Sequence, residues 1–179
     1  LYHENPDLFS SINGARKEPE GSRRTDRQPH LANPDAASYA AKQALSYFSS
    51  EPEALSFSLS TNDNTSFDDT DLTQSLVAPI EYFRGKPNYS DLVFTFMNRV
   101  ATKVFSKDDA LYSNAKEPRY LTALAYYWTE AVPSFPLHER IMPILTADRA
   151  QWHDPAFRME DMELIRQWKE SGVERLGVW

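Results

Sequence analysis

The chain has 179 residues, of which 41% are hydrophobic and 13% aromatic, and its 19 basic and 26 acidic side chains give a formal net charge of −7. This composition is typical of a folded acidic domain. It disfavours a nucleic-acid-binding surface, because neutralising phosphates requires clustered lysine and arginine. The absence of cysteine excludes disulfides, iron–sulfur clusters and thiol nucleophiles. No apolar segment approaches the roughly 20 residues that a membrane-spanning helix needs.

The first third of the chain predicts a loop, a helix and a strand. Residues 6–31 are rich in glycine and proline and lack periodicity, which is typical of a loop. Asn33 then suits the N-cap of a helix that has Pro34 at its first position. Small and apolar residues recur at helical spacing from there, so we expect a helix over residues 34–49. Residues 55–60 alternate apolar side chains with serine, which predicts a strand.

The middle of the chain predicts one strong helix and two further strands. Residues 64–88 are polar and irregular, with one short apolar patch. Apolar side chains on a single helical face predict a helix over residues 89–105. Residues 120–127 are apolar and are expected to form a buried strand. Residues 140–145 are another strand candidate, although Pro143 weakens that prediction.

The last segment predicts a helix and a final strand. Residues 159–171 favour a helix with Met162, Ile165 and Trp168 facing inward, and Gly172 suits its C-cap. Residues 173–179 are expected to form the last strand. Strands that alternate with amphipathic helices indicate an α/β fold with parallel strands and right-handed crossovers.

Four such strands fit an open sheet or part of a (β/α)8 barrel, and a whole barrel typically takes about 250 residues. The chain opens without methionine and closes on a strand. We therefore expect residues 1–179 to be part of a single barrel domain cut from a longer chain. The alternative is a small domain whose last strand lies at a sheet edge.

Four short segments together resemble a known family. Residues 6–16 read Pro-Asp-Leu-Phe-Ser-Ser-Ile-Asn-Gly-Ala-Arg, residues 28–34 Gln-Pro-His-Leu-Ala-Asn-Pro, residues 58–63 Ser-Leu-Ser-Thr-Asn-Asp and residues 124–128 Leu-Ala-Tyr-Tyr-Trp. The chain resembles the domain of unknown function 4838 family. That resemblance implies a bacterial, extracellular or periplasmic, glycoside-hydrolase-like (β/α)8 barrel related to α-glucuronidases and β-hexosaminidases. Family members usually continue with glycine and a cysteine-containing run, which residues 64–71 lack.

The strand ends supply two candidate catalytic carboxylates, because function in a barrel collects at the carboxyl ends of the strands. Asp63 follows the strand of residues 55–60, and Glu130 follows the strand of residues 120–127. Paired carboxylates are the machinery of glycoside hydrolysis. The alternatives are that Asp63 only caps an Asx turn and that Glu130 is an exposed loop residue. If residues 55–61 are strand four, the second acid would instead lie just beyond Trp179.

Aromatic and amide side chains beside these acids are candidate sugar-binding groups, because aromatic rings stack on the apolar faces of pyranoses. They are Asn62, Tyr127, Trp128, Trp179 and His30, although a structural role for His30 is also open.

No metal or cofactor is expected. The aspartates at 68, 69 and 71 do not fit a calcium loop, since glycine and glutamate are not in register, and we expect a solvated acidic loop. The histidines lack the i, i+4 spacing of helical metal ligands. Asp148 and Arg149 are expected to form a surface ion pair.

The leading hypothesis is a glycoside-hydrolase-like domain that acts on an oligosaccharide or polysaccharide through paired carboxylates in the full-length protein. The catalytic site is expected to be incomplete within residues 1–179. The first alternative is a barrel that binds carbohydrate without catalysis. The second is a structural or interaction domain. The oligomeric state stays open.

Overall fold

The core of the protein is a four-stranded parallel sheet. The computed structural model describes residues 1–20, 26–106 and 117–179. Its strands follow one another across the sheet in chain order. They are β3 (Ser56–Ser58), β6 (Tyr120–Ala125), β7 (Ile141–Leu145) and β8 (Gly177–Val178). The predicted α/β fold with parallel strands is thus confirmed, while closure into a barrel stays a prediction.

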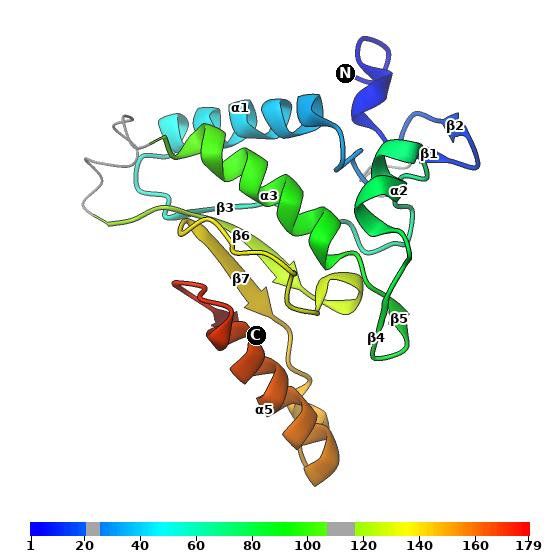
Figure 1. The fold of residues 1–179 in the computed structure, drawn as a ribbon. Coiled ribbons are helices and arrows are strands. Elements are labelled where there is room, and N and C mark those ends of the chain that lie inside the picture. The colour runs from blue at the N-terminus through cyan, green and yellow to red at the C-terminus, as the bar shows by residue number, and fades with distance from the viewer. Residues whose placement is uncertain (21–25, 107–116) are drawn as a thin grey trace.

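Three long helices pack on one face of this sheet. They are α1 (Pro34–Ser50), α3 (Ser90–Val104) and α5 (Pro155–Glu170). Figure 1 shows α1 and α3 lying side by side over the strands. Ring contacts tie the layers together: Phe48 of α1 meets Phe57 of β3, and Phe94 of α3 meets Trp168 of α5 at a centroid distance of 5.3 Å. The helices and the sheet therefore share one hydrophobic core.

The capping signals in the sequence explain where the helices begin. The Asn33 side chain accepts a hydrogen bond from the Asp35 backbone N–H at 2.9 Å, which confirms the predicted start of α1. Asp154 caps α5 in the same way, by accepting from Ala156 N–H at 2.8 Å. Helix α5 consequently begins four residues before the predicted boundary.

The inward face of α5 differs in part from the prediction. Trp168 is fully buried, as predicted, but Met162 is 50% exposed, so its predicted inward position is wrong. Leu164 and Asp161 lie on the buried face with Trp168. A residue two positions from Leu164 is rotated to the opposite side of the helix, which explains the exposure of Met162. The C-cap is Ser171 rather than the predicted Gly172, which follows it with φ of 85°, the left-handed conformation in which helices commonly end.

Strand β7 accommodates Pro143 because the missing N–H would have no strand partner. Backbone N–H groups alternate sides along a strand, and Ala147 N–H donates to Trp179 O on the β8 side. The nitrogen of Pro143 points to that same side. Strand β8 pairs only with Ile144 and Leu145, so no ladder bond is lost.

Two hairpins and a short helix form in segments that the sequence left irregular. They are the hairpin of β1 (Ser11–Ile12) with β2 (Ala15–Arg16), helix α2 (Asp71–Val77), and the hairpin of β4 (Tyr82–Phe83) with β5 (Lys86–Pro87). Both hairpins turn through two residues with positive φ, Asn13-Gly14 and Arg84-Gly85. The second hairpin brings Arg84 to the site described below. None of the helices in the described ranges is long and apolar enough to cross a membrane.

Candidate functional site

Two adjoining cavities lie at the carboxyl ends of the parallel strands. The larger has a volume of about 780 Å³ and the smaller of about 260 Å³. Tyr126, which follows β6, and Trp179, which follows β8, line both cavities. This is the edge at which parallel α/β sheets bind ligands.

The structure brings six of the seven predicted site residues to this edge. Asn62, Asp63 and Trp128 line the smaller cavity, Tyr127 and Glu130 line the larger one, and Trp179 lines both.

His30 is the exception. It is buried, with Nε2 3.2 Å from Asp68 Oδ2 and Nδ1 3.1 Å from the carbonyl oxygen of Asp7. The ring thus packs into a polar cluster at the N-terminal side of the fold. These contacts suit the structural alternative for His30.

Asp63 and Asn62 both line the smaller cavity but differ in exposure and in hydrogen bonding. Asp63 is exposed, whereas the Asn62 side chain donates to the backbone oxygen of Arg27 at 2.6 Å. Asn62 therefore helps to hold the strand-end loop that carries Asp63. A hydrogen bond with Tyr127 raises the pKa of Tyr126 to about 12, and burial and the negative charge of Asp63 add to that shift.

Trp128 and Tyr127 lie in a 3-10 turn (Tyr127–Thr129) directly after Tyr126. Trp128 is half-buried and packs against the core, while Tyr127 is 38% exposed. The ring of Trp128 thus packs against the core, while that of Tyr127 is more exposed.

Glu130 is a buried carboxylate that lines the larger cavity. It is 9% exposed, and its backbone oxygen accepts a hydrogen bond from Trp168 Nε1 at 2.9 Å. Arg84 Nη1 donates to Glu130 Oε1 at 2.6 Å. Burial raises the pKa of Glu130, the charge and hydrogen bond of Arg84 oppose that shift, and the charge of Asp161 adds to it. The net result is a glutamate that holds its proton to a higher pH than usual.

Arg84 and Asp161 are site residues that the sequence reasoning missed. Arg84 Nη1 also donates to Asp161 Oδ1 at 2.8 Å, and Trp152 Nε1 donates to Asp161 Oδ2 at 2.8 Å. Both residues line the larger cavity. A signal for Asp161 existed: it shares the helical stripe of Leu164 and Trp168, and a charged residue on an apolar face marks a buried ion pair.

Backbone strain also gathers at the larger cavity. The non-glycine residues with positive φ in the described ranges are Asn13, Arg84 and Tyr127. Arg84 and Tyr127, each with φ of 49°, both line the cavity. The Lys86 ammonium lies 4.8 Å from the centroid of the Tyr127 ring. Strained residues cluster at functional sites, so this observation supports a functional role for the cavity.

A second buried carboxylate, Asp68, lies in the polar cluster that contains His30. The predicted solvated loop is wrong here, because Asp68 is only 4% exposed. It accepts hydrogen bonds from Ser11 N–H at 2.7 Å and Thr73 Oγ1 at 2.8 Å, and from both the N–H and the hydroxyl of Thr70. Arg16 Nη1 lies 3.3 Å away. Asp68 therefore joins the first hairpin to α2.

Asp148, which the sequence placed in a surface ion pair, lines the larger cavity and accepts a hydrogen bond from Gln151. Within the described ranges, no group of three or more acidic or histidine side chains is arranged to hold a metal ion.

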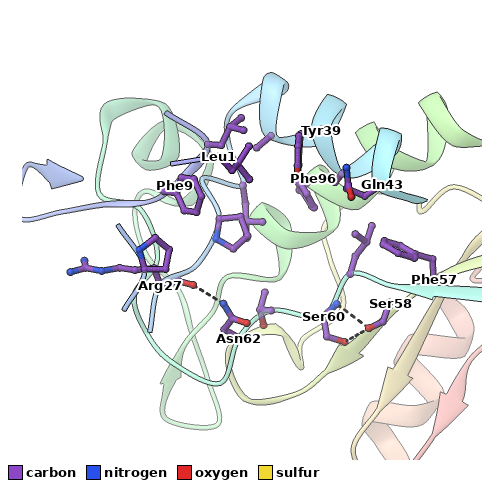
Figure 2. A pocket seen from close by; sticks show the side chains of 18 residues that line it. Leu1, Phe9, Arg27, Tyr39, Gln43, Phe57, Ser58, Ser60, Asn62 and Phe96 are labelled. Carbon is purple, nitrogen blue, oxygen red and sulfur yellow. Dashed lines mark hydrogen bonds between the residues drawn. The ribbon is translucent and has the colours of Figure 1, made fainter. Parts of the chain in front are cut away.

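A third hollow lies between β3 and α1 and is mostly apolar. Figure 2 shows Tyr39 and Gln43 of α1 facing Phe57 of β3 across it, and the Asn62–Arg27 hydrogen bond near one end. Its volume is about 340 Å³. Arg27 is its one ionisable side chain besides Tyr39, so it lacks the carboxylates that distinguish the strand-end cavities.

The comparisons with known proteins identify a family and no named homologue. The whole chain, residues 1–179, matches the family described as "Domain of unknown function (DUF4838)". No curated protein matches the chain, and no solved structure does. The expected relation to α-glucuronidases and β-hexosaminidases accordingly stays a prediction. With a match over its full length, the chain belongs to the DUF4838 family.

Proposed function

We propose that the carboxyl edge of the sheet binds a carbohydrate and supports hydrolysis of a glycosidic bond, with Asp63 and Glu130 as the two carboxylates. The observation that carries this proposal is their placement. They follow the neighbouring strands β3 and β6 and line adjoining cavities that share Tyr126 and Trp179. Carboxylates flanked by aromatic rings match the needs of a sugar site.

The environments of the two carboxylates suggest separate roles. Glu130 is buried, and its raised pKa suits a proton donor to the leaving oxygen. Asp63 is exposed to the smaller cavity and suits the role of nucleophile or of base for water. We also infer that the sheet is part of a (β/α)8 barrel, supported by its parallel strands in chain order.

The charge of the larger cavity favours a neutral sugar over an acidic one. Four carboxylates and two cations line it. The carboxylates are Glu130, Asp148, Glu160 and Asp161, and the cations are Arg84 and Lys86. A surplus of negative charge in a cleft repels an anionic ligand. This balance argues against a uronic acid, although the predicted family relation includes glucuronidases.

Tryptophan fluorescence tests the binding half of the proposal, because Trp128 and Trp179 line the smaller cavity. We expect neutral oligosaccharides to change the emission saturably and uronic-acid oligosaccharides to bind more weakly. Trp179→Ala should weaken binding. Tyr39→Ala, in the hollow of Figure 2, is the matched control and should leave it unchanged. Equal loss in both variants, or no binding of any sugar, would refute the site.

Hydrolysis of aryl glycosides tests the catalytic half. Asp63→Asn and Glu130→Gln should each lower the rate by a factor on the order of 10² or more, since each removes one acid or base. Both variants should still bind the sugar. Unchanged rates would rule out these carboxylates.

One observation favours non-catalytic carbohydrate binding as the second candidate. Arg84 occupies one oxygen of Glu130 at 2.6 Å. If that contact persists when sugar is bound, Glu130 serves to order the cavity. Saturable sugar binding without turnover by any variant or by the wild-type protein would favour this candidate.

A further inference from the structure

Four side chains from separate parts of the chain form one hydrogen-bonded series. Trp152 donates to Asp161, and Arg84 donates to both Asp161 and Glu130. Arg84 comes from the β4–β5 hairpin, Asp161 from α5, and Glu130 from the loop after β6. The series therefore links the proposed acid to two elements that lie outside the sheet.

A single atom of Arg84 donates to both carboxylates. Nη1 of Arg84 lies 2.6 Å from Glu130 Oε1 and 2.8 Å from Asp161 Oδ1. The two carboxylate oxygens are thus held within about twice a hydrogen-bond length of each other. The positive charge of Arg84 thus faces both negative groups, and Lys86, which lines the same cavity, adds a second positive charge near Glu130.

The hydrogen bonds distinguish the two carboxylates. Both oxygens of Asp161 accept from N–H donors, which is the arrangement that suits a carboxylate ion. Glu130 accepts from Arg84 through Oε1, and no donor in the described ranges bonds to its Oε2. A proton on Oε2 of Glu130 would therefore compete with no hydrogen-bond donor from the described residues.

Resting on the proposed function, we propose that Asp161 is a positioning residue that poises Glu130 as the proton donor, by holding Arg84 in a contact shared between the two carboxylates. Arg84 on its own favours the ionised form of Glu130, against the effect of burial, and the charge of Asp161 offsets part of that preference. Shared with Asp161, it keeps the Glu130 side chain in place and leaves it able to carry and release a proton. Trp152 keeps Asp161 in the position that this sharing requires.

NMR titration of the side-chain carboxyl carbons of ¹³C-labelled glutamate tests the proposal, with Glu130→Gln used to assign the resonance of Glu130. In Asp161→Asn, Arg84 pairs with Glu130 alone, so the midpoint of Glu130 should fall by about one pH unit. In Arg84→Met it should rise. Asp148→Asn is the matched control, because it removes a carboxylate that lines the same cavity without contacting Arg84. Its effect should be much smaller than that of Asp161→Asn.

An unchanged midpoint in Asp161→Asn, or an equal fall in Asp148→Asn, would overturn the positioning role. Asp161→Ser, which can still accept from Trp152, takes the place of Asp161→Asn if that variant does not fold. Sugar assays on the same proteins separate this proposal from the function itself. If the midpoints move as expected and no sugar binds, the coupling stands and the function fails. If sugar is cleaved and the limb of the pH–rate profile on which activity falls with rising pH does not shift with Asp161→Asn, the positioning role fails and the function stands.

Discussion

Asp68 and Glu130 are both buried carboxylates with an arginine partner, yet their surroundings differ. Asp68 is 4% exposed and accepts hydrogen bonds from Ser11, Thr70 and Thr73, besides its contacts with Arg16 and His30. Burial alone would raise the pKa of Asp68, but the hydrogen bonds from Thr70, Ser11 and Thr73 outweigh it and lower that pKa.

Glu130 is almost as buried, at 9% exposed, but it accepts one side-chain hydrogen bond, from an arginine that it shares with Asp161. Its pKa is raised. A carboxylate surrounded by donors stabilises the fold as an ion, whereas one that faces a cavity with few donors is held at a cost in stability. The comparison thus separates an acid that stabilises the fold as an ion from one whose pKa is raised beside a cavity.

Removing the structural acid should have the largest effect on stability. Asp68→Ala leaves Arg16, His30 and several buried donors without their acceptor, so the free energy of unfolding should fall by about 3 kcal/mol. Urea unfolding followed by circular dichroism measures this loss. Asp69→Ala is the control, because Asp69 is exposed and accepts one hydrogen bond, from Gly14 N–H at 3.2 Å. A similar loss in both variants would contradict the structural role of Asp68.

Because the pKa of Asp68 is lowered in the folded protein, the stability that Asp68 contributes should decrease at acidic pH. A carboxyl whose pKa is lower in the folded state contributes stability above its unfolded pKa of about 4, and that contribution is lost as the pH falls through the folded pKa. The stability gap between the wild type and Asp68→Asn should therefore be constant from pH 7 to about pH 5. Below about pH 4 it should shrink. Urea midpoints at several pH values measure the gap, and a gap that is independent of pH would contradict this account.

Local sequence patterns predicted some of these features and missed others. Glu130 and Asp63 could be predicted because each comes directly after a strand, and the carboxyl ends of parallel strands meet at one edge. Helix α1 could be predicted because its cap, Asn33, and its apolar spacing agree. In these cases the signal lies within a few neighbouring residues.

The roles of Asp68 and Arg84 could not be predicted from neighbouring residues. Asp68 stands in an acidic, polar segment that resembles a solvated loop. Besides its local donors Thr70 and Thr73, it contacts the first hairpin through Ser11, 57 residues earlier in the chain. Arg84 lies in a hairpin whose Arg-Gly turn lacks the usual asparagine, and its partners Glu130 and Asp161 lie 46 and 77 residues later. Contacts of this range depend on the packed fold, so a local pattern does not reveal them.

Neutralising Glu130 should have the smallest effect on stability, with the opposite sign of pH dependence. Because the pKa of Glu130 is raised in the folded protein, its ionisation costs stability as the pH rises through the unfolded pKa of about 4.3 towards the folded value. Glu130→Gln keeps an oxygen that can accept from Arg84, and Arg84 keeps its contact with Asp161. Relative to the wild type, the variant should therefore gain stability between about pH 4 and pH 7, by about 1 kcal/mol at most. Paired urea titrations at these two pH values measure the change. If the wild type gained stability over Glu130→Gln across this interval, Glu130 would be a stabilising ion like Asp68, and the distinction between the two carboxylates would fail.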